Sequence, residues 1–97
     1  MPTYVLLIIW TEQGVKSAKS TVDRARHAQQ LAQSMGGDLS TIYWTLGSHD
    51  VVGVAEMPDD ETATALAVAI ASQGHVRTET LRAFSAEEMQ RILQKVP

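Results

Sequence analysis

The segment of residues 3–11, TYVLLIIWT, constrains the fold most because it is apolar without interruption from Tyr4 to Trp10. Its aromatic and β-branched residues predict a strand, and it is too short for an isolated buried helix. Successive side chains of a strand point to opposite faces, so this strand must be covered on both faces. Residues 51–57 are apolar on both faces as well. We therefore expect two central strands in one sheet.

Two further segments are predicted to be strands of more mixed polarity. Residues 38–46 pair with residues 51–57 through the turn Gly47-Ser48-His49-Asp50, with Ile42, Trp44 and Leu46 on one face. Residues 76–84, VRTETLRAF, form the fourth strand. Charged and polar side chains gather on these two strands, as expected at the edges of a sheet: Asp38, Ser40, Arg77, Glu79 and Arg82.

Three helices are predicted from capping residues and apolar spacing. The first covers residues 21–35, with Ser20 as N-cap, Asp23 at N3 and Gly36-Gly37 at its end. Its apolar stripe is Val22, Ala25, Ala28, Ala32 and Met35, whereas Arg24 and the other polar residues face elsewhere. The second covers residues 60–73 after the cap Asp59, with Ala63, Leu66, Ala67 and Ile70 as its buried stripe. The third follows the capping box of Ser85 and Glu88.

The resulting order, βαββαβ with an additional C-terminal helix, is that of the ferredoxin-like plait. It predicts an α+β fold with an antiparallel sheet in the strand order 4-1-3-2, and a single domain over residues 1–97. The two most apolar strands are the central ones in this order, and the two polar ones are its edges. Length agrees, because 97 residues suffice for one core and not for two.

The second face of this sheet requires a cover, since the two crossover helices can lie on one face only. The C-terminal helix offers a stripe of only four residues, Met89, Ile92, Leu93 and Val96. Leaving several hundred Å² of apolar surface wet would forgo on the order of 10 kcal/mol. We therefore predict a homodimer, or an assembly of dimers, with sheets packed face to face as in a dimeric α/β barrel.

Composition excludes several classes of protein. The formal charge is −3 and no run of Lys or Arg could follow a phosphate backbone, which argues against nucleic acid as a partner. There are no cysteines, so disulfides, thiolate metal sites and cysteine nucleophiles are excluded. No apolar run approaches the roughly 20 residues of a membrane span, and no basic segment precedes residue 4 as in a signal peptide. A cytoplasmic location is the expectation.

Several separated segments together resemble the GYD domain family of small bacterial proteins. They are the opening Tyr4-Val5-Leu6-Leu7, the hairpin segment YWTLGSHD of residues 43–50, and VRTETLRAFS of residues 76–85. The resemblance covers nearly the whole chain and implies a dimeric ferredoxin-like α/β barrel without an assigned activity. Gly47 and Asp50 fit the motif that names the family, but His49 stands where the family leads us to expect Tyr.

The pair His49-Asp50 is the candidate catalytic site, because a histidine oriented by a carboxylate can act as a general base. The competing interpretation is structural: Gly and Asp are favoured turn residues, and adjacent side chains tend to point apart. The three histidines, His27, His49 and His75, share no spacing typical of metal ligands, so neither a metal nor any other cofactor is expected.

The candidate ligand-binding residues are Trp10, Tyr43, Trp44, Gly47 and Arg77. The aromatic side chains could line a pocket for an apolar or planar molecule, but buried aromatic residues are more often core or interface anchors. Arg77 could bind an anion, or pair with Glu79 on the same side of its strand at a gain of at most about 1 kcal/mol.

Two hypotheses follow for the function. The first is a non-enzymatic binding or assembly module that holds a small apolar molecule, or none, between its two sheets. The second is a cofactor-independent isomerase or monooxygenase-like enzyme in which His49 acts as acid and base, an idea that rests on analogy of fold. The first is preferred, and replacement of His49 by Ala would separate them.

Overall fold

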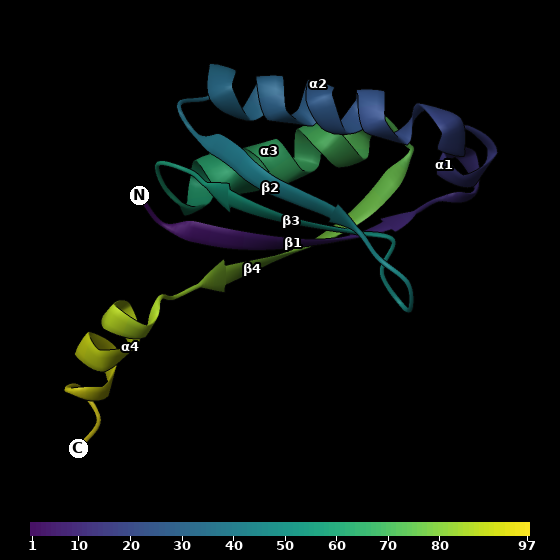
Figure 1. The fold of residues 1–97 in the computed structure, drawn as a ribbon. Helices are drawn as coiled ribbons and strands as arrows, with labels where there is room; N and C mark the ends of the chain where they lie inside the picture. The colour runs from purple at the N-terminus through teal and green to yellow at the C-terminus, as the bar shows by residue number, and fades with distance from the viewer.

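The computed structural model describes residues 1–97 and has nine short elements along the chain (Figure 1). In order they are β1 (Thr3–Trp10), α1 (Glu12–Lys16), a 3-10 turn η1 (Ala18–Ser20), α2 (Thr21–Ser34), β2 (Asp38–Trp44), β3 (Val51–Glu56), α3 (Asp60–Ser72), β4 (Val76–Ala83) and α4 (Ala86–Leu93). All four predicted strands and all three predicted helices are present, and α1 with η1 occupies the segment after β1 for which no element was predicted.

The four strands form one antiparallel sheet in the order β2-β3-β1-β4, which is the predicted order 4-1-3-2 read from the other edge. Helices α2 and α3 lie side by side on one face of this sheet, so the chain folds into two layers (Figure 1). The predicted α+β, ferredoxin-like architecture is confirmed. The central strands β1 and β3 are the two that the sequence marked as apolar on both faces.

The core lies between the sheet and these two helices. Its buried side chains alternate along the strands and recur along the helices, as the two periodicities require: Tyr4, Leu6, Leu39, Ala55, Met57, Ala32, Ala63 and Leu66. On α3 the predicted stripe is confirmed for Ala63 and Leu66, which are buried, and for Ile70, which packs against them, whereas Ala67 is only half-buried. On α2 the prediction for Val22 was wrong, because Val22 is exposed and Leu31 packs against the core instead.

A β-bulge in β2 changes which of its residues face the helices. Leu39 pairs with Ala55 and Thr41 with Val54, so Ser40 is the extra residue between them. The bulge lets Leu39 and Ile42 both face the core although three positions separate them. Strand β2 also ends at Trp44, so the prediction that Leu46 lies in this strand beside Ile42 was wrong, and Leu46 is fully exposed.

The predicted caps have mixed outcomes. Asp59 caps α3, its carboxylate accepting a hydrogen bond from the Thr62 amide at 2.7 Å. Ser85 and Glu88 form the complete capping box of α4. Ser20 makes no side-chain capping bond, because η1 runs directly into α2 and holds Ser20 in a turn conformation (φ −92°, ψ 4°) instead of the extended one that a capping side chain requires.

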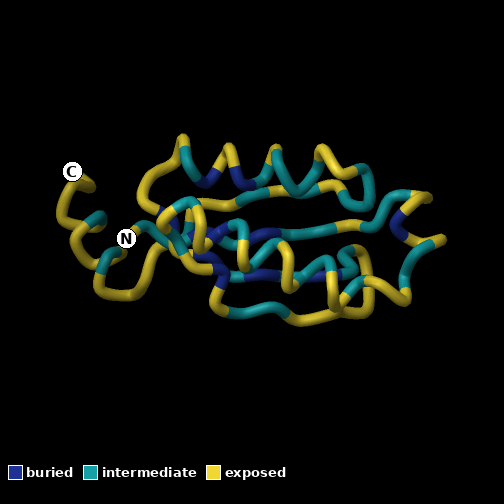
Figure 2. The backbone as a smooth tube through the Cα atoms, turned by 90° about the horizontal axis from the view of Figure 1, so that it is seen from above, coloured by how far each residue is buried: buried dark blue, intermediate teal, exposed yellow.

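The C-terminal helix α4 projects away from the rest of the molecule (Figure 1). It contains no buried residue, and nearly its whole length is exposed (Figure 2). It does not cover the face of the sheet opposite α2 and α3, which we call the open face. The open face consists of the alternate side chains that point away from the helices: Val5, Leu7 and Ile9, Val52 and Val54, Thr41 and Tyr43, and Arg77, Glu79 and Leu81.

Candidate functional site

The loop between β2 and β3 is a tightly bonded turn. The Thr45 amide donates to the Asp50 carbonyl at 2.9 Å, and the Thr45 hydroxyl donates to the His49 carbonyl at 2.6 Å. Gly47 has a φ of 106°, which side chains other than glycine adopt only with strain. A Cβ at Gly47 would meet no atom within 4 Å, so the backbone conformation, and not lack of space, calls for glycine there. Gly47 therefore shapes the loop.

Asp50 fastens this loop to the end of β1. One carboxylate oxygen, Oδ2, accepts a hydrogen bond from the Trp10 amide at 2.9 Å, and the Asp50 amide donates to the Ile8 carbonyl at 2.9 Å. His49 instead approaches Ser48, with 3.2 Å between Nδ1 and the Ser48 hydroxyl oxygen. No hydrogen bond joins the side chains of His49 and Asp50, so the carboxylate does not orient the imidazole in this structure.

A hollow of about 280 Å³ on the open face brings two of the candidate residues together. His49 and Arg77 line it with Glu79 and Thr78, and Leu7 and Ile9 form its apolar floor. Neither Arg77 nor Glu79 takes part in an ion pair within the chain. Tyr43 lies on the same face and is 67% exposed. It is the neighbour of Val52 on the side away from Leu7. A molecule in this hollow would meet one imidazole, one guanidinium and one carboxylate above an apolar surface.

The two tryptophans do not face this hollow. The Trp44 indole N–H donates to the Thr21 hydroxyl of α2 at 3.0 Å. The Trp44 side chain lines a second hollow, of about 60 Å³, beneath α2. The indole nitrogen of Trp10 is buried without a hydrogen-bond partner. The candidate ligand-binding residues are therefore divided between the two sides of the sheet.

The hollow beneath α2 contains a charged residue that sequence reasoning placed elsewhere. Arg24 lines it, together with the small residues Ala25 and Ala28 and with Gly53 of β3. Nη1 of Arg24 donates to the Ser17 carbonyl at 2.8 Å, whereas Nη2 is buried without a hydrogen-bond partner. The i, i+4 spacing of Arg24 and Ala28 was the available signal, because residues four apart share a helix face.

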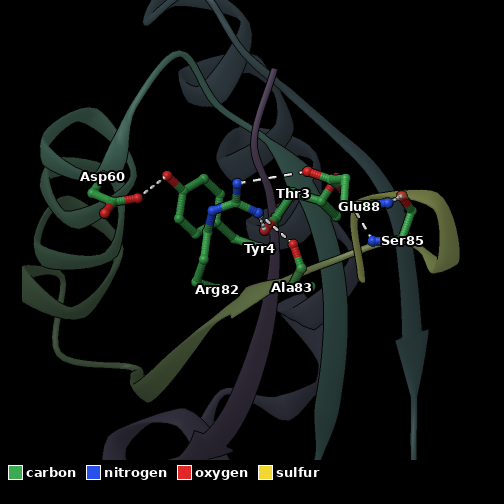
Figure 3. A network of polar contacts seen from close by, with 7 residues as sticks. All are labelled: Thr3, Tyr4, Asp60, Arg82, Ala83, Ser85 and Glu88. Carbon is green, nitrogen blue, oxygen red and sulfur yellow. Dashed lines mark hydrogen bonds and ion pairs between the residues drawn. The ribbon is translucent and has the colours of Figure 1, made fainter. Parts of the chain in front are cut away.

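A polar network joins the start of β1 to the base of α4 (Figure 3). The Tyr4 hydroxyl donates to Asp60 Oδ1 at 2.5 Å, and burial, this hydrogen bond and the nearby negative charge raise the pKa of Tyr4 to about 12. Arg82 stacks over the rings of Tyr4 and Phe84, at 5.7 and 4.5 Å from their centroids, and lies 3.8 Å from the Glu88 carboxylate. Arg82 thus links Tyr4 of β1 to Glu88 in the first turn of α4.

Glu88 makes two reciprocal hydrogen bonds with Ser85 at the start of α4. Its carboxylate accepts a hydrogen bond from the Ser85 amide at 3.0 Å, and its own amide donates to the Ser85 hydroxyl at 3.1 Å. The bond from the Ser85 amide is the main cause that lowers the pKa of Glu88, with Arg82 and Arg91 adding favourable charge. The first turn of α4 is therefore closed by two specific bonds (Figure 3).

No group of three or more His, Asp or Glu side chains lies close enough together to hold a metal ion. None of the helices combines the length and the apolar character needed to cross a membrane.

Comparison with known proteins agrees with this architecture. The GYD domain family model matches residues 4–93, from the start of β1 to the end of α4. The chain belongs to the GYD domain family. The match includes both the loop between β2 and β3 and α4.

Two individual matches to this GYD domain come from Thermus thermophilus. One is a protein named glutamine synthetase and cystathionine beta-lyase binding protein, which is 30% identical over 90 residues that cover 92% of this chain and 95% of the relative. The second is the crystal structure of TTHA0845, with a TM-score of 0.58 and 25% identity, covering 89% of this chain and 96% of the other. The ferredoxin-like fold of this GYD domain is thus shared by a solved structure.

Proposed function

We propose that this GYD domain is a non-enzymatic binding and assembly module that works as a homodimer joined through the open face of its sheet. The observation that carries the proposal is that α4 leaves this face uncovered. Apolar side chains form the central rows of the face, with Val5, Leu7 and Ile9 on β1 beside Val52 and Val54 on β3. A second copy presents the same rows, and a two-fold axis lets one surface cover its equal.

Burial supports this role of the open face. Val5, Leu7, Val52 and Val54 are only half-buried within one chain, and Ile9 and Leu81 are each 42% exposed. Removing several hundred Å² of such surface from water contributes on the order of 10 kcal/mol at about 25 cal/mol per Å². That is comparable to the whole stability of a small domain. We therefore expect the protein to be a dimer at micromolar concentration, as in a dimeric α/β barrel.

The partners that we propose are other proteins and a small molecule. The relative from Thermus thermophilus is named as a binding protein for two enzymes, and we extend protein binding, without its particular partners, to this chain. The hollow of His49, Arg77 and Glu79 lies on the open face, so dimerisation would place it at the edge of the cleft between the sheets. A small, mostly apolar molecule would bind there in the cytoplasm, without a cofactor and without nucleic acid.

The test compares oligomeric states by light scattering. The native chain should have twice the 10.6 kDa mass of one chain, and Leu7→Asp, which places a charge at the centre of the open face, should be monomeric. Val68→Asp is the matched control, because Val68 is 62% exposed on α3, on the other side of the molecule. Circular dichroism would verify that both variants are folded. A native chain that stays monomeric at micromolar concentration would refute the proposal.

The alternative is a cofactor-independent isomerase or monooxygenase-like enzyme, favoured by the same hollow. His49 would be its acid and base there, and Arg77 would hold an anionic group of the substrate. His49→Ala should then abolish turnover of any substrate that is found while the dimer persists. If ligand binding and turnover are unchanged in His49→Ala, the enzymatic alternative fails and the binding module remains.

A further inference from the structure

Two parts of the chain project on the side of the open face, at opposite ends of the sheet. One is α4, and the other is the loop of residues 45–50 between β2 and β3, the teal loop at the lower right of Figure 1. Seen from above, α4 runs across the direction of the strands, beyond the end of the sheet (Figure 2). Each projection would therefore reach a second copy that covered the open face.

The projecting helix has an apolar stripe that nothing in its own chain covers. Met89 and Leu93, four positions apart on α4, are 43 and 55% exposed, and Val96, three residues beyond the end of the helix, is 62% exposed. The capping box holds the first turn of the helix, and the contact between Arg82 and Glu88, at 3.8 Å, links that turn to β4. The helix presents its exposed apolar side chains to solvent beyond the end of the sheet.

The projecting loop carries an apolar side chain of its own. Leu46 has a relative exposure of 102%, the highest among the large apolar residues. The loop is nevertheless held firmly, by the bonds of Thr45 within it and by those of Asp50 to β1. A fully exposed leucine on a bonded loop offers apolar surface whose burial against an apolar helix stripe would be favourable.

The open face has a small footprint for a stable interface. Four strands about 4.8 Å apart and about 20 Å long cover roughly 400 Å². A stable specific interface buries about 800 Å² on each partner. Contacts beyond the sheet, made by α4 and the loop, would supply the difference.

Symmetry allows two arrangements, and the thickness of a helix selects one of them. In the first, α4 meets α4 at one end of the dimer and loop meets loop at the other. In the second, each copy is reversed end for end, so that every α4 meets the partner's loop. Packed sheets are about 10 Å apart and one helix is about 10 Å thick, which leaves room for one helix at each end and not for two. The reversed arrangement satisfies this limit.

We infer that α4 of each copy packs its apolar stripe on Leu46 in the loop of the other copy, forming two identical contacts at the ends of the dimer. This inference rests on the homodimer proposed above and states how it is held together. It also assigns α4 a place in the site, because the loop carries His49. The partner's α4 then forms the outer wall of the hollow of His49, Arg77 and Glu79, which is complete only in the dimer.

Cross-linking can test the inference cleanly because the chain has no cysteine. Leu46→Cys and Leu93→Cys are made in separate chains, mixed so that subunits exchange, and treated with a short bis-maleimide. We expect a covalent dimer in the mixture and none from either variant alone. The matched control replaces Leu93→Cys by Glu87→Cys, which lies on the opposite side of α4 with a side chain 88% exposed and should cross-link weakly. A covalent dimer from Leu93→Cys alone would overturn the inference in favour of α4 against α4.

A second measurement uses the dissociation constant of the dimer. Leu93→Asp should raise it by about tenfold or more, whereas Gln90→Asp, which adds the same charge outside the stripe, should change it by less than about threefold. Neither residue contributes to the core, so both variants should fold. If the native chain is a monomer, the proposed homodimer fails. If it is a dimer that Leu93→Asp leaves equally tight, only the contact inferred for α4 fails.

Discussion

At the scale of single residues, Asp50 was a candidate catalytic residue, but its side chain has a structural role. Its carboxylate accepts the hydrogen bond of the Trp10 amide, a backbone group at the end of β1. A carboxylate used in this way continues the pairing of β1 with β3 beyond the last backbone contact. His49, its neighbour, is left to interact with Ser48 and to line the hollow on the open face.

Replacement of Asp50 by Ala should therefore lower stability. The Trp10 amide would lose its acceptor, and the loss of a hydrogen bond to a charged group costs about 1.5–3 kcal/mol. Chemical denaturation of Asp50→Ala and of the native chain measures the difference. Ser48→Ala is the control, because the Ser48 side chain contacts only His49, and its free energy of unfolding should be unchanged. Equal stability of Asp50→Ala and the native chain would contradict the structural role of Asp50.

Tyr4 predicts how stability depends on alkaline pH. Its pKa in the folded chain is raised to about 12, whereas an unfolded tyrosine has a pKa near 10. Because the fold favours the neutral phenol, the stabilisation is complete below about pH 10 and is lost as pH rises from 10 to 12. The free energy of unfolding of the native chain should fall over this interval more steeply than that of Tyr4→Phe.

The titration itself can be observed directly. The chain has two tyrosines, so in Tyr43→Phe the ultraviolet absorbance of phenolate reports Tyr4 alone. We expect its midpoint near pH 12 while the chain stays folded. In Tyr43→Phe/Asp60→Asn the hydrogen bond to a charged carboxylate is removed and the midpoint should move toward 10. A midpoint near 10 in Tyr43→Phe would show that the Tyr4 hydroxyl is not held by Asp60.

At the scale of elements, α3 separates residues that pack from residues that do not. Leu66 is 1% exposed in the core, and Val68 is 62% exposed on the same helix. Leu66→Ala should cost about 2–5 kcal/mol because it leaves a cavity between α3 and the sheet. Val68→Ala should change stability by less than about 0.5 kcal/mol. Denaturant unfolding of the two variants would check this pair, and similar losses in both would contradict the packing of α3.

Most elements could be predicted from the sequence because their signals are local and strong. The uninterrupted apolar run of β1, the capping aspartate of α3 and the capping box of α4 each depend on a few neighbouring residues. The order of the strands was predicted from the βαββαβ order of the elements, and the apolar character of the two central strands agreed with it. The apolar pattern, the capping residues and the order of the elements all indicate the same fold, and that prediction was correct.

The failures have physical causes that a periodic pattern does not contain. Ser20 has the right residue type for a cap, but the preceding 3-10 turn holds its backbone in another conformation. The bulge at Ser40 changes the face of Leu39 without leaving a mark in the apolar pattern. Arg24 was assigned to the solvent side by its charge, although its guanidinium reaches back to the Ser17 carbonyl.

The candidate site was less predictable than the fold because it depends on contacts between distant segments. Residue types alone suggested that His49 and Asp50 act together, and that Trp10, Tyr43 and Trp44 share a cleft. Alternation along β2 places Tyr43 and Trp44 on opposite faces. The engagement of Asp50 by Trp10 joins residues forty positions apart, so only the folded chain reveals it.

At the scale of the whole molecule, the chain has two layers, a sheet and a pair of helices on one face of it. The helices cover one face, α4 is held away from the other, and the extents of 50 × 31 × 18 Å describe an elongated and thin shape. A thin domain of this size buries a modest share of its surface. In the homodimer that we propose, part of the free energy of folding therefore comes from association.

Such coupling makes stability depend on protein concentration. If the folded state is a dimer and the unfolded state a single chain, each tenfold dilution lowers the free energy of unfolding per dimer by about 1.4 kcal/mol. The thermal midpoint of the native chain should therefore fall on dilution, whereas that of the Leu7→Asp monomer should be lower and independent of concentration. Calorimetry or circular dichroism over a hundredfold range of concentration would measure both. A concentration-independent midpoint in the native chain would mean that one copy alone is sufficient, and that the open face is stable in contact with water.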